Sequence, residues 1–321
     1  MNSLYGIGVF AMAGLVLPAF VDSGVWLNFI MMTLYAALLG QAWNILGGLA
    51  GQFSFGHALF FGFGAYTQAI LQMQGAWNPW AALLASIAVA AAVGAMVGAI
   101  SFRYGLKGSY FALVTLAFAE VCRIVAVSVQ FTGGGVGLML PLKPSVANLQ
   151  FPSKLGFIYV LLALVLFALL LTWWLKHSRL GAYMQAVRDN EEAAKAVGVR
   201  PTSVKIWGIT LSGGLMGAAG AVYLQIFQYI DPGIAFGPHV SVEALVTAIV
   251  GGMGSLWGPL LGALVLHLLS DMTRNLFGAL PGLNMVIYGA VLVLIVMFAP
   301  RGIAGIGVSV RRLWRGSGKH D

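Results

Sequence analysis

The sequence has very little charge for its length. Only 8% of its 321 residues are Asp, Glu, Lys or Arg, whereas 60% are hydrophobic, and the mean hydropathy is +0.91. A soluble domain carries about 25% charged residues, so this composition excludes a soluble enzyme or a soluble binding domain. It predicts an all-α, polytopic membrane protein whose helices satisfy their own backbone polar groups in the lipid bilayer.

Residues and motifs for catalysis are also missing. The tail segment GSGKH (316–320) lacks the first glycine and the hydroxyl residue of a phosphate-binding loop, and TGGGVG (132–137) is more typical of a turn. The five histidines are scattered without metal-ligand spacing, and the single cysteine, Cys122, excludes an internal disulfide. We therefore expect a non-catalytic protein with no metal and no cofactor, whose energy for uphill work comes from another polypeptide.

The net charge of +8 does not indicate nucleic-acid binding. The basic residues collect in short loops and in the C-terminal tail, which is the positive-inside distribution of a membrane protein. The first residues, MNSLYGIGVF, have neither a basic region nor a small-residue cleavage site, so we expect a retained helix rather than a signal peptide.

Long apolar runs cover most of the chain. Runs of about 18 to 24 residues are long enough to cross a bilayer core of about 30 Å. They lie at 4–21, 26–46, 53–74, 79–102, 109–130, 156–175, 206–229, 255–272 and 283–300. A shorter run, 240–252, predicts a tilted, broken or re-entrant helix. We expect about ten membrane segments (8–10) in a single permease-like domain, 1–321.

The basic loops predict the orientation of these segments. The loop at 103–107, the segment Lys176–Lys205 and the tail 301–321 should share the cytoplasmic side, with both termini. The loop 131–155 then lies outside, although it carries two lysines. Ten crossings divide into two halves of five, which gives the halves opposite topology, as in transporters built from inverted repeats.

One segment interrupts the apolar pattern near the middle of the chain. Lys176–Lys205, which we call the charged segment, has basic residues at 176, 179, 188, 195, 200 and 205 and acidic residues at 189, 191 and 192. A polar, helix-prone insertion between long apolar runs is typical of a surface presented to a partner in the water phase.

Local signals predict a short helix inside the charged segment. Asp189 is expected to cap its start, with Glu192 three residues later completing a variant of the capping box. Glu191 and Lys195 form an i, i+4 pair in the favourable order.

Two residues are expected to end this helix after about two turns. Gly198 stops it, and Pro201 should prevent its resumption. Isolated helices this short are marginal in water, so the helix needs a surface on which to dock. That surface is either a partner or the chain's own membrane domain, and the spacing alone leaves both open.

Two acid-x-x-Arg pairs lie inside apolar runs. Glu120 with Arg123 and Asp271 with Arg274 each fall on one face of a helix. Such pairs either line a translocation path or form intrahelical ion pairs that make the charges tolerable in the membrane.

Four further polar residues are candidates for the path. Glu243 has no obvious partner in the sequence, and Gln52, Ser54 and His57 belong to a glycine-punctuated entry into a helix. They could line a cavity, although a buried, hydrogen-bonded histidine is the more common role for His57.

The sequence resembles the permease subunits of branched-chain amino acid ABC importers. The resemblance spans nearly the whole chain. It is carried, in this order, by GGLAGQFSFGHALFFGFGAYTQAI (47–70), GSYFALVTLAFAEVCRIV with TGGGVGL (108–125, 132–138), SRLGAYMQAVRDNEEAAKAVGV (178–199) and EALVTAIVGGMGSLWGPLLGAL (243–264). The charged segment and GSLWGP (254–259) indicate the LivM-like rather than the LivH-like type.

The third stretch looks like the EAA loop of bacterial import permeases, which docks the ATPase. The residues implied in docking are Arg188, Asp189, Glu191, Glu192, Ala193, Ala194 and Gly198. The consensus continues to Leu-Pro, whereas this chain has Leu211-Ser212.

The resemblance implies a bacterial inner-membrane protein that pairs with a second, related permease. Two cytoplasmic ATP-binding subunits and a periplasmic solute-binding protein would complete the importer. The implied cargo is a branched-chain or related neutral amino acid, with urea, short amides or another small polar solute as the alternative. An ion-coupled secondary transporter is a further alternative, for which Glu243 would be the coupling acid.

Overall fold

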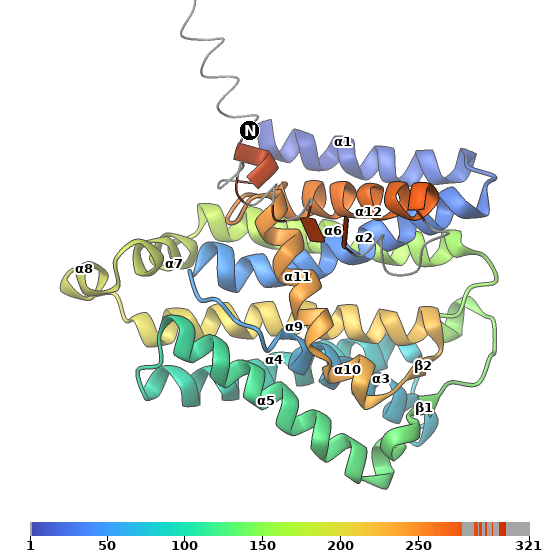
Figure 1. Cartoon of the computed structure of the whole chain (residues 1–321), viewed down its shortest axis with the longest axis horizontal. Helices are drawn as coiled ribbons and strands as arrows, with labels where there is room; N and C mark the ends of the chain where they lie inside the picture. The colour runs from blue at the N-terminus through green and yellow to red at the C-terminus, as the bar shows by residue number, and fades with distance from the viewer. Residues whose placement is uncertain are drawn as a thin grey trace, which may run out of the picture.

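The computed structural model describes residues 2–277 together with 286–287, 289–290, 293, 297 and 302–305. This part of the chain is mostly helical, with one two-stranded ribbon (Figure 1). The predicted all-α membrane class is therefore confirmed. The predicted last span, 283–300, and the tail, 301–321, lie largely outside the described residues.

The helices follow the apolar runs closely. Their bounds are α1 Asn2–Val16, η1 Leu17–Phe20, α2 Gly24–Asn44, η2 Ile45–Leu49, α3 His57–Met73, α4 Pro79–Arg103, α5 Gly108–Ser128, η3 Gln130–Thr132, η4 Gly134–Val136, η5 Val146–Asn148, α6 Lys154–His177, α7 Arg179–Asp189, α8 Glu191–Ala196, α9 Pro201–Phe227, α10 Pro232–Phe236, α11 Pro238–Gly251 and α12 Gly258–Phe277. The strands are β1 Leu138–Met139 and β2 Tyr229–Ile230.

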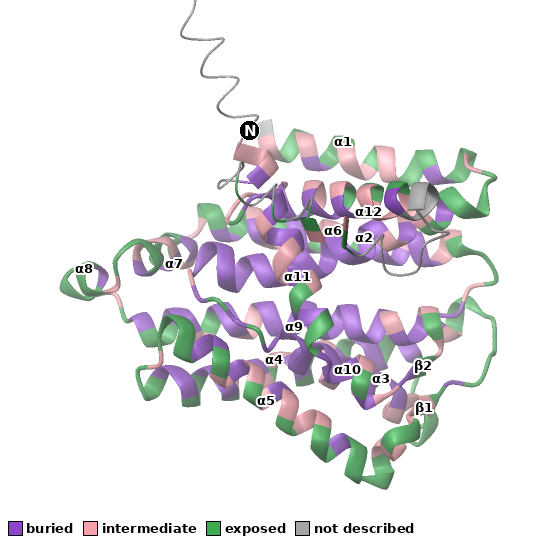
Figure 2. Ribbon diagram, in the orientation of Figure 1, coloured by how far each residue is buried: buried purple, intermediate pink, exposed green. Residues whose placement is uncertain are grey.

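Two buried helices organise the packing. α9 packs along α3 and α4, and α2 packs against α6, α11 and α12. Figure 2 shows that α2 and α9 are mostly buried, whereas α1 and α5 have long exposed faces. Small residues allow the closest contacts: a Cβ at Gly64 would overlap the backbone of Gly217, and one at Gly220 would overlap the carbonyl of Phe61.

The loops lie at two opposite ends of the molecule. The Lys107 ammonium lies 3.3 Å from the Glu191 carboxylate, so the turn after α4 and the charged segment share one end, as predicted. The start of α1 lies toward this charged end (Figure 1). At the opposite end, which we call the ribbon end, β1 pairs antiparallel with β2.

The short apolar run at 240–252 belongs to a longer, broken helix. Helical structure begins at Pro232, is interrupted at Gly237 and resumes at Pro238. The pair α10–α11 starts beside the ribbon, and the turn after α11 meets α2 near the charged end, where Asn44 accepts a hydrogen bond from Gly254. Of the geometries allowed by the sequence, the broken helix is the one observed.

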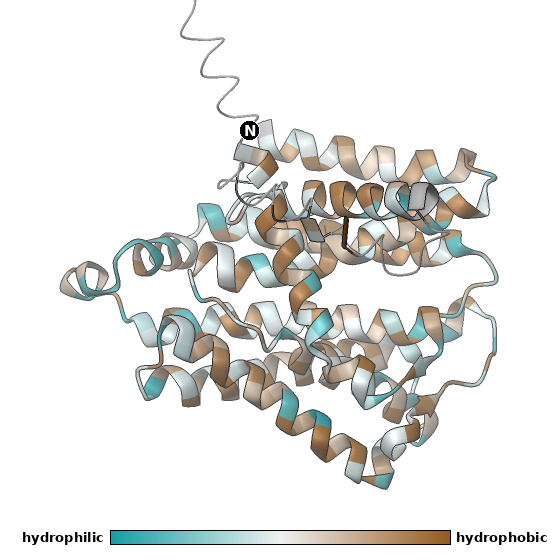
Figure 3. Cartoon of the chain, in the orientation of Figure 1, coloured by the Kyte–Doolittle hydropathy of each residue, from teal (hydrophilic) through white to brown (hydrophobic). Residues whose placement is uncertain are grey.

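Seven helices in the described part are long and apolar enough to cross a membrane. They include the combined segment Pro232–Gly251, and a shorter apolar helix covers Gly258–Thr273. Figure 3 shows hydrophobic residues along much of the outer helices α5 and α12. The predicted span at 53–74 is shorter than expected because α3 begins only at His57 and has 17 residues.

Candidate functional site

The charged segment folds into two short helices. Ser178 caps α7 by accepting a hydrogen bond from the Gly181 N–H at 3.2 Å. Asn190 caps α8 by accepting from the Ala193 N–H at 3.0 Å. The prediction that Asp189 caps the docking helix is therefore wrong, because Asp189 is the last residue of α7 and the neighbouring amide side chain provides the cap.

The end of α8 follows the predicted glycine signal. α8 ends at Ala196, and Gly198 has a φ of +88°, a left-handed conformation that glycine adopts without strain. The prediction that Pro201 would prevent a helix from resuming is wrong, because α9 begins at this residue. Pro201 occupies the first turn of α9, where proline lacks only an N–H that would have no helical partner.

Glu191 attaches α8 to the membrane domain. Its carboxylate lies 2.9 Å from the Lys205 ammonium on α9, 3.3 Å from Lys107 and 3.8 Å from Lys195. Burial alone would raise the pKa of Glu191, but hydrogen bonds and positive charge from Lys205 and Lys107 outweigh it and lower that pKa. The same contact raises the pKa of Lys107.

The outer face of α8 remains open. Glu192 has an exposed side chain that pairs with Lys195 at 3.0 Å, and Val197 is 80% exposed. Ala193 and Gly198 are also exposed, whereas Ala194 is buried. A groove of about 410 Å³ adjoins this face, lined by Leu180, Tyr183, Val197, Gly198, Val199, Arg200, Ser203, Val204 and Trp207.

The other predicted docking residue, Arg188, faces the membrane domain. Its Nη1 donates to the Gly48 carbonyl at 2.9 Å, and its guanidinium also pairs with Asp189 at 3.0 Å. The charged segment therefore has an inward side that contacts two parts of the membrane domain and an outward side that is free of them.

The predicted path residues near α3 are buried in the protein. Gln52, Ser54 and His57 have almost no exposed surface. The Trp43 indole donates to the Ser54 carbonyl at 2.9 Å. His57 Nε2 lies 2.8 Å from the Ser212 hydroxyl, which itself donates to the Ala42 carbonyl, so Nε2 is the donor to Ser212.

The backbone between η2 and α3 is not helical and is partly uncovered. Phe53 and Phe55 are 40% and 37% exposed, and the segment 51–56 runs across the face of the molecule drawn in front in Figure 1. It ends at His57 beside Ser212, close to the middle of α9. Irregular backbone at membrane depth requires protein cover or a water-filled cavity.

The charged residues of the membrane helices differ in their surroundings. Glu120 and Arg123 form an intrahelical ion pair on a partly exposed face of α5, with contacts of 2.6 and 2.9 Å. Glu243 lies on α11 and makes no ion pair with any described residue. The Arg274 side chain lies outside the described residues, so the second acid-x-x-Arg pair stays a prediction.

A cavity of about 380 Å³ lies between α3, α5 and α10. Its lining is largely aromatic and aliphatic, and it includes Phe63, Tyr66, Phe131 and Phe236. The Tyr66 hydroxyl is buried and has no hydrogen-bond partner within the described part of the chain. Sequence reasoning missed this site because its walls come from helices that are distant in sequence.

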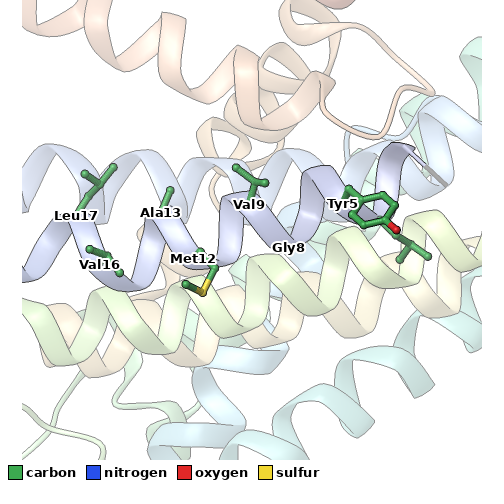
Figure 4. Close-up of a pocket in the computed structure, with 8 residues that line it drawn as sticks. Tyr5, Gly8, Val9, Met12, Ala13, Val16 and Leu17 are labelled. Carbon is green, nitrogen blue, oxygen red and sulfur yellow. The ribbon is translucent and has the colours of Figure 1, made fainter.

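A third hollow, of about 910 Å³, runs along the outside of α1 and is lined by Leu4, Tyr5, Gly8, Val9, Met12, Ala13, Val16 and Leu17. Figure 4 shows the labelled residues of this lining, from Tyr5 to Leu17, following one another along α1 and the start of η1. The surface is open and nearly all apolar, which suits lipid chains better than a polar solute. Among the described residues, no group of three His, Cys, Asp or Glu side chains could hold a metal ion.

Comparisons of the sequence with known proteins match this chain to one family. Residues 5–296 match a family described as "Branched-chain amino acid transport system / permease component". A high-affinity branched-chain amino acid transport system permease protein LivM from Salmonella typhimurium strain LT2 is 30% identical over 297 residues, which cover 85% of this chain and 68% of the relative. LivM from Escherichia coli K12 is 28% identical over 329 residues, which cover 95% of this chain and 75% of the relative. LivH from Salmonella typhimurium strain LT2 is 23% identical over 290 residues, which cover 84% of this chain and 91% of the relative.

Proposed function

The chain belongs to the family of permease components of branched-chain amino acid transport systems, and we propose that it forms one half of the membrane domain of an ATP-driven importer. It is a multi-pass membrane protein and a transport permease. In the proposed assembly it is the non-catalytic subunit, and it pairs with a second, LivH-like permease.

The observation that carries this proposal is the partly uncovered segment 51–56. Phe53 and Phe55 are exposed on a non-helical stretch that reaches His57, near the middle of α9. Lipid cannot satisfy irregular backbone, so this face must contact another protein or water. Both conditions are met where two permeases enclose a central path, and the break at Gly237 adds a second discontinuous element.

The outward side of α8 is the proposed docking surface for the ATPase. Glu192, Ala193 and Gly198 are exposed there, while Glu191 and Arg188 anchor the segment to the membrane domain. With two ATP-binding subunits at the charged end, that end and the chain termini lie in the cytoplasm of a bacterial inner membrane. A periplasmic solute-binding protein then delivers its cargo at the ribbon end.

The packing between helices of the two predicted halves supports their inverted topology. α2, from the first half, packs against α6, α11 and α12 of the second half. α9, from the second half, packs against α3 and α4 of the first half. This reciprocal packing is expected when two related halves of opposite topology form one domain. It also supports a single permease domain over 1–321.

The cavity beside Tyr66 supports a neutral, partly aliphatic cargo. Its largely apolar lining matches the side chain of a branched-chain amino acid, the class printed in the names of the relatives. These walls would leave the polar groups of urea and short amides without hydrogen-bond partners. Glu243 is half-buried on α11, but family membership favours ATP-driven over ion-coupled transport.

Uptake into proteoliposomes tests the proposal. The chain is reconstituted with its LivH-like partner, with or without the ATP-binding subunits, and radiolabelled leucine and urea are supplied with the binding protein. We expect leucine uptake only when ATP and the ATPases are both present. Uptake by the permeases alone, driven by an ion gradient, would contradict the proposal.

A further inference from the structure

Two glycine-rich linkers meet at the charged end. The first, 45–51, ends the α2–η2 helix, and the second, 252–258, joins α11 to α12. The Asn44 side chain binds both the Gly254 N–H, at 2.7 Å, and the Ser255 carbonyl, at 3.0 Å. A Cβ on Gly48 would overlap the Gly254 nitrogen. The two linkers, which we call the glycine junction, are therefore in direct contact.

Arg188 enters this junction from the charged segment. Its Nη1 donates to the Gly48 carbonyl at 2.9 Å. Its side chain packs so closely on Gly51 that a Cβ there would overlap it, and Nη1 lies 3.1 Å from the position of a Cβ on Gly254. The Gly48 carbonyl belongs to the last turn of a helix, where carbonyls lack helical partners and a cation is favoured.

Arg188 is held from the other side by the charged segment itself. Its Nε donates to Asp189 at 3.0 Å, and both residues end α7, immediately before α8. A force on α8 is therefore delivered to the Arg188 guanidinium over a short stretch of chain. Beyond the junction, Gly51 has a φ of +68° and the backbone leaves helical geometry. The Gln52 N–H donates to the Leu46 carbonyl at 3.0 Å, so the segment 51–56 is tied to the junction and a displacement of the junction is passed on to it.

We propose that Arg188 is a positioning residue that links α8 to the segment 51–56, so that movement of a docked ATPase reorients the face that carries Phe53 and Phe55. This inference rests on the proposed function. Arg188 then has a different role from exposed docking residues such as Glu192, because the Arg188 guanidinium contacts the membrane domain. Loss of a docking residue should release the ATPase, whereas loss of Arg188 should leave the ATPase bound and uncouple it from transport.

Variants of the reconstituted importer distinguish these roles. Arg188→Ala removes the contact, Arg188→Lys keeps a cation with a single donor group, and Asp189→Asn weakens the support of the guanidinium. Arg179→Ala is the matched control, since Arg179 is an exposed arginine on the same helix. The readouts are ATPase co-purification, ATP hydrolysis, leucine uptake per ATP hydrolysed and hydrogen exchange at residues 47–56.

For Arg188→Ala we expect normal co-purification and hydrolysis, with uptake per ATP reduced about tenfold, which is within the range single residues contribute to coupling between sites. Hydrogen exchange at 47–56 should accelerate even without ATPases. Arg188→Lys and Asp189→Asn should give intermediate losses, and Arg179→Ala none. An unchanged coupling ratio in Arg188→Lys and Asp189→Asn would overturn the inference, whatever the folding of Arg188→Ala. Absence of ATP-dependent uptake in the unmodified importer would instead contradict the proposed function.

Discussion

The Lys205 ammonium on α9 lies 2.9 Å from the Glu191 carboxylate on α8, and the Lys205 side chain is only 4% exposed. This contact joins the docking helix to the beginning of α9. Lys205 also lies 5.5 Å from the centre of the Phe102 ring, so its charge is enclosed by the end of α4 as well. The pair makes α8 part of the membrane domain rather than a free loop.

Removal of one member of this pair should destabilise the protein more than removal of both. Glu191→Gln leaves the enclosed Lys205 charge without its nearest counter-ion, and we expect a loss of about 1 to 3 kcal/mol in the free energy of unfolding. The double variant Glu191→Gln with Lys205→Met should recover a large part of that loss. Thermal unfolding of the purified chain in detergent measures both, and strictly additive effects would contradict the pairing.

The attachment of α8 should depend on pH. Because contacts with Lys205 and Lys107 lower the pKa of Glu191 in the folded protein, their stabilising effect is complete above the ordinary carboxyl range, near pH 4. It is lost as the pH falls through the lowered pKa. A spin label on Val197→Cys, in a Cys122→Ser background, should become more mobile below about pH 4. The same label on a Glu191→Gln background should show no such transition.

The two candidate caps of α8 can be separated by substitution. Asn190→Ala should cost about 1 kcal/mol of helix stability and speed hydrogen exchange in residues 191–197 about fivefold. Asp189→Ala should leave that exchange unchanged, because Asp189 lies in α7 and makes no capping contact to α8. Equal effects of the two substitutions would contradict the observed cap.

Two glycines in membrane helices should respond oppositely to alanine. A Cβ at Gly64 would overlap the Gly217 backbone, so Gly64→Ala should force α3 away from α9 and cost about 1 to 3 kcal/mol. Gly8→Ala is the control, since nothing lies within 4 Å of a Cβ at Gly8. The apparent melting temperature should fall for the first variant and hold or rise for the second.

The sequence anticipated the features that depend on local signals. Apolar length located most of the helices, and Gly198 correctly marked the end of α8. The prediction of the α8 cap was wrong because Asp189 and its neighbour Asn190 can both cap a helix, and the sequence does not decide between them. The prediction for Pro201 was also wrong, since proline suits the first turn of a helix as well as a break.

The remaining features depend on tertiary contacts that no local pattern carries. Nothing near Glu191 in the sequence indicates that Lys205 is its partner, and nothing near Arg188 points to Gly48. The cavity beside Tyr66 likewise depends on helices brought together only by folding. The glycine-rich stretches at 47–62 and 251–262, which resemble each other only in glycine content, prove to contain the residues where two linkers touch.

The most direct test of the central claim is the accessibility of residue 53 during the ATP cycle. In the assembled importer, with Cys122→Ser as background, Phe53→Cys is exposed to a membrane-impermeant thiol reagent in the nucleotide-free and ATP-trapped states. Val9→Cys, on the lipid-facing side of α1, is the control and should react only with a lipid-soluble reagent. If segment 51–56 lines an alternating-access path, reactivity at residue 53 will change with nucleotide state. Reaction with the lipid-soluble reagent alone, identical in both states, would contradict the account.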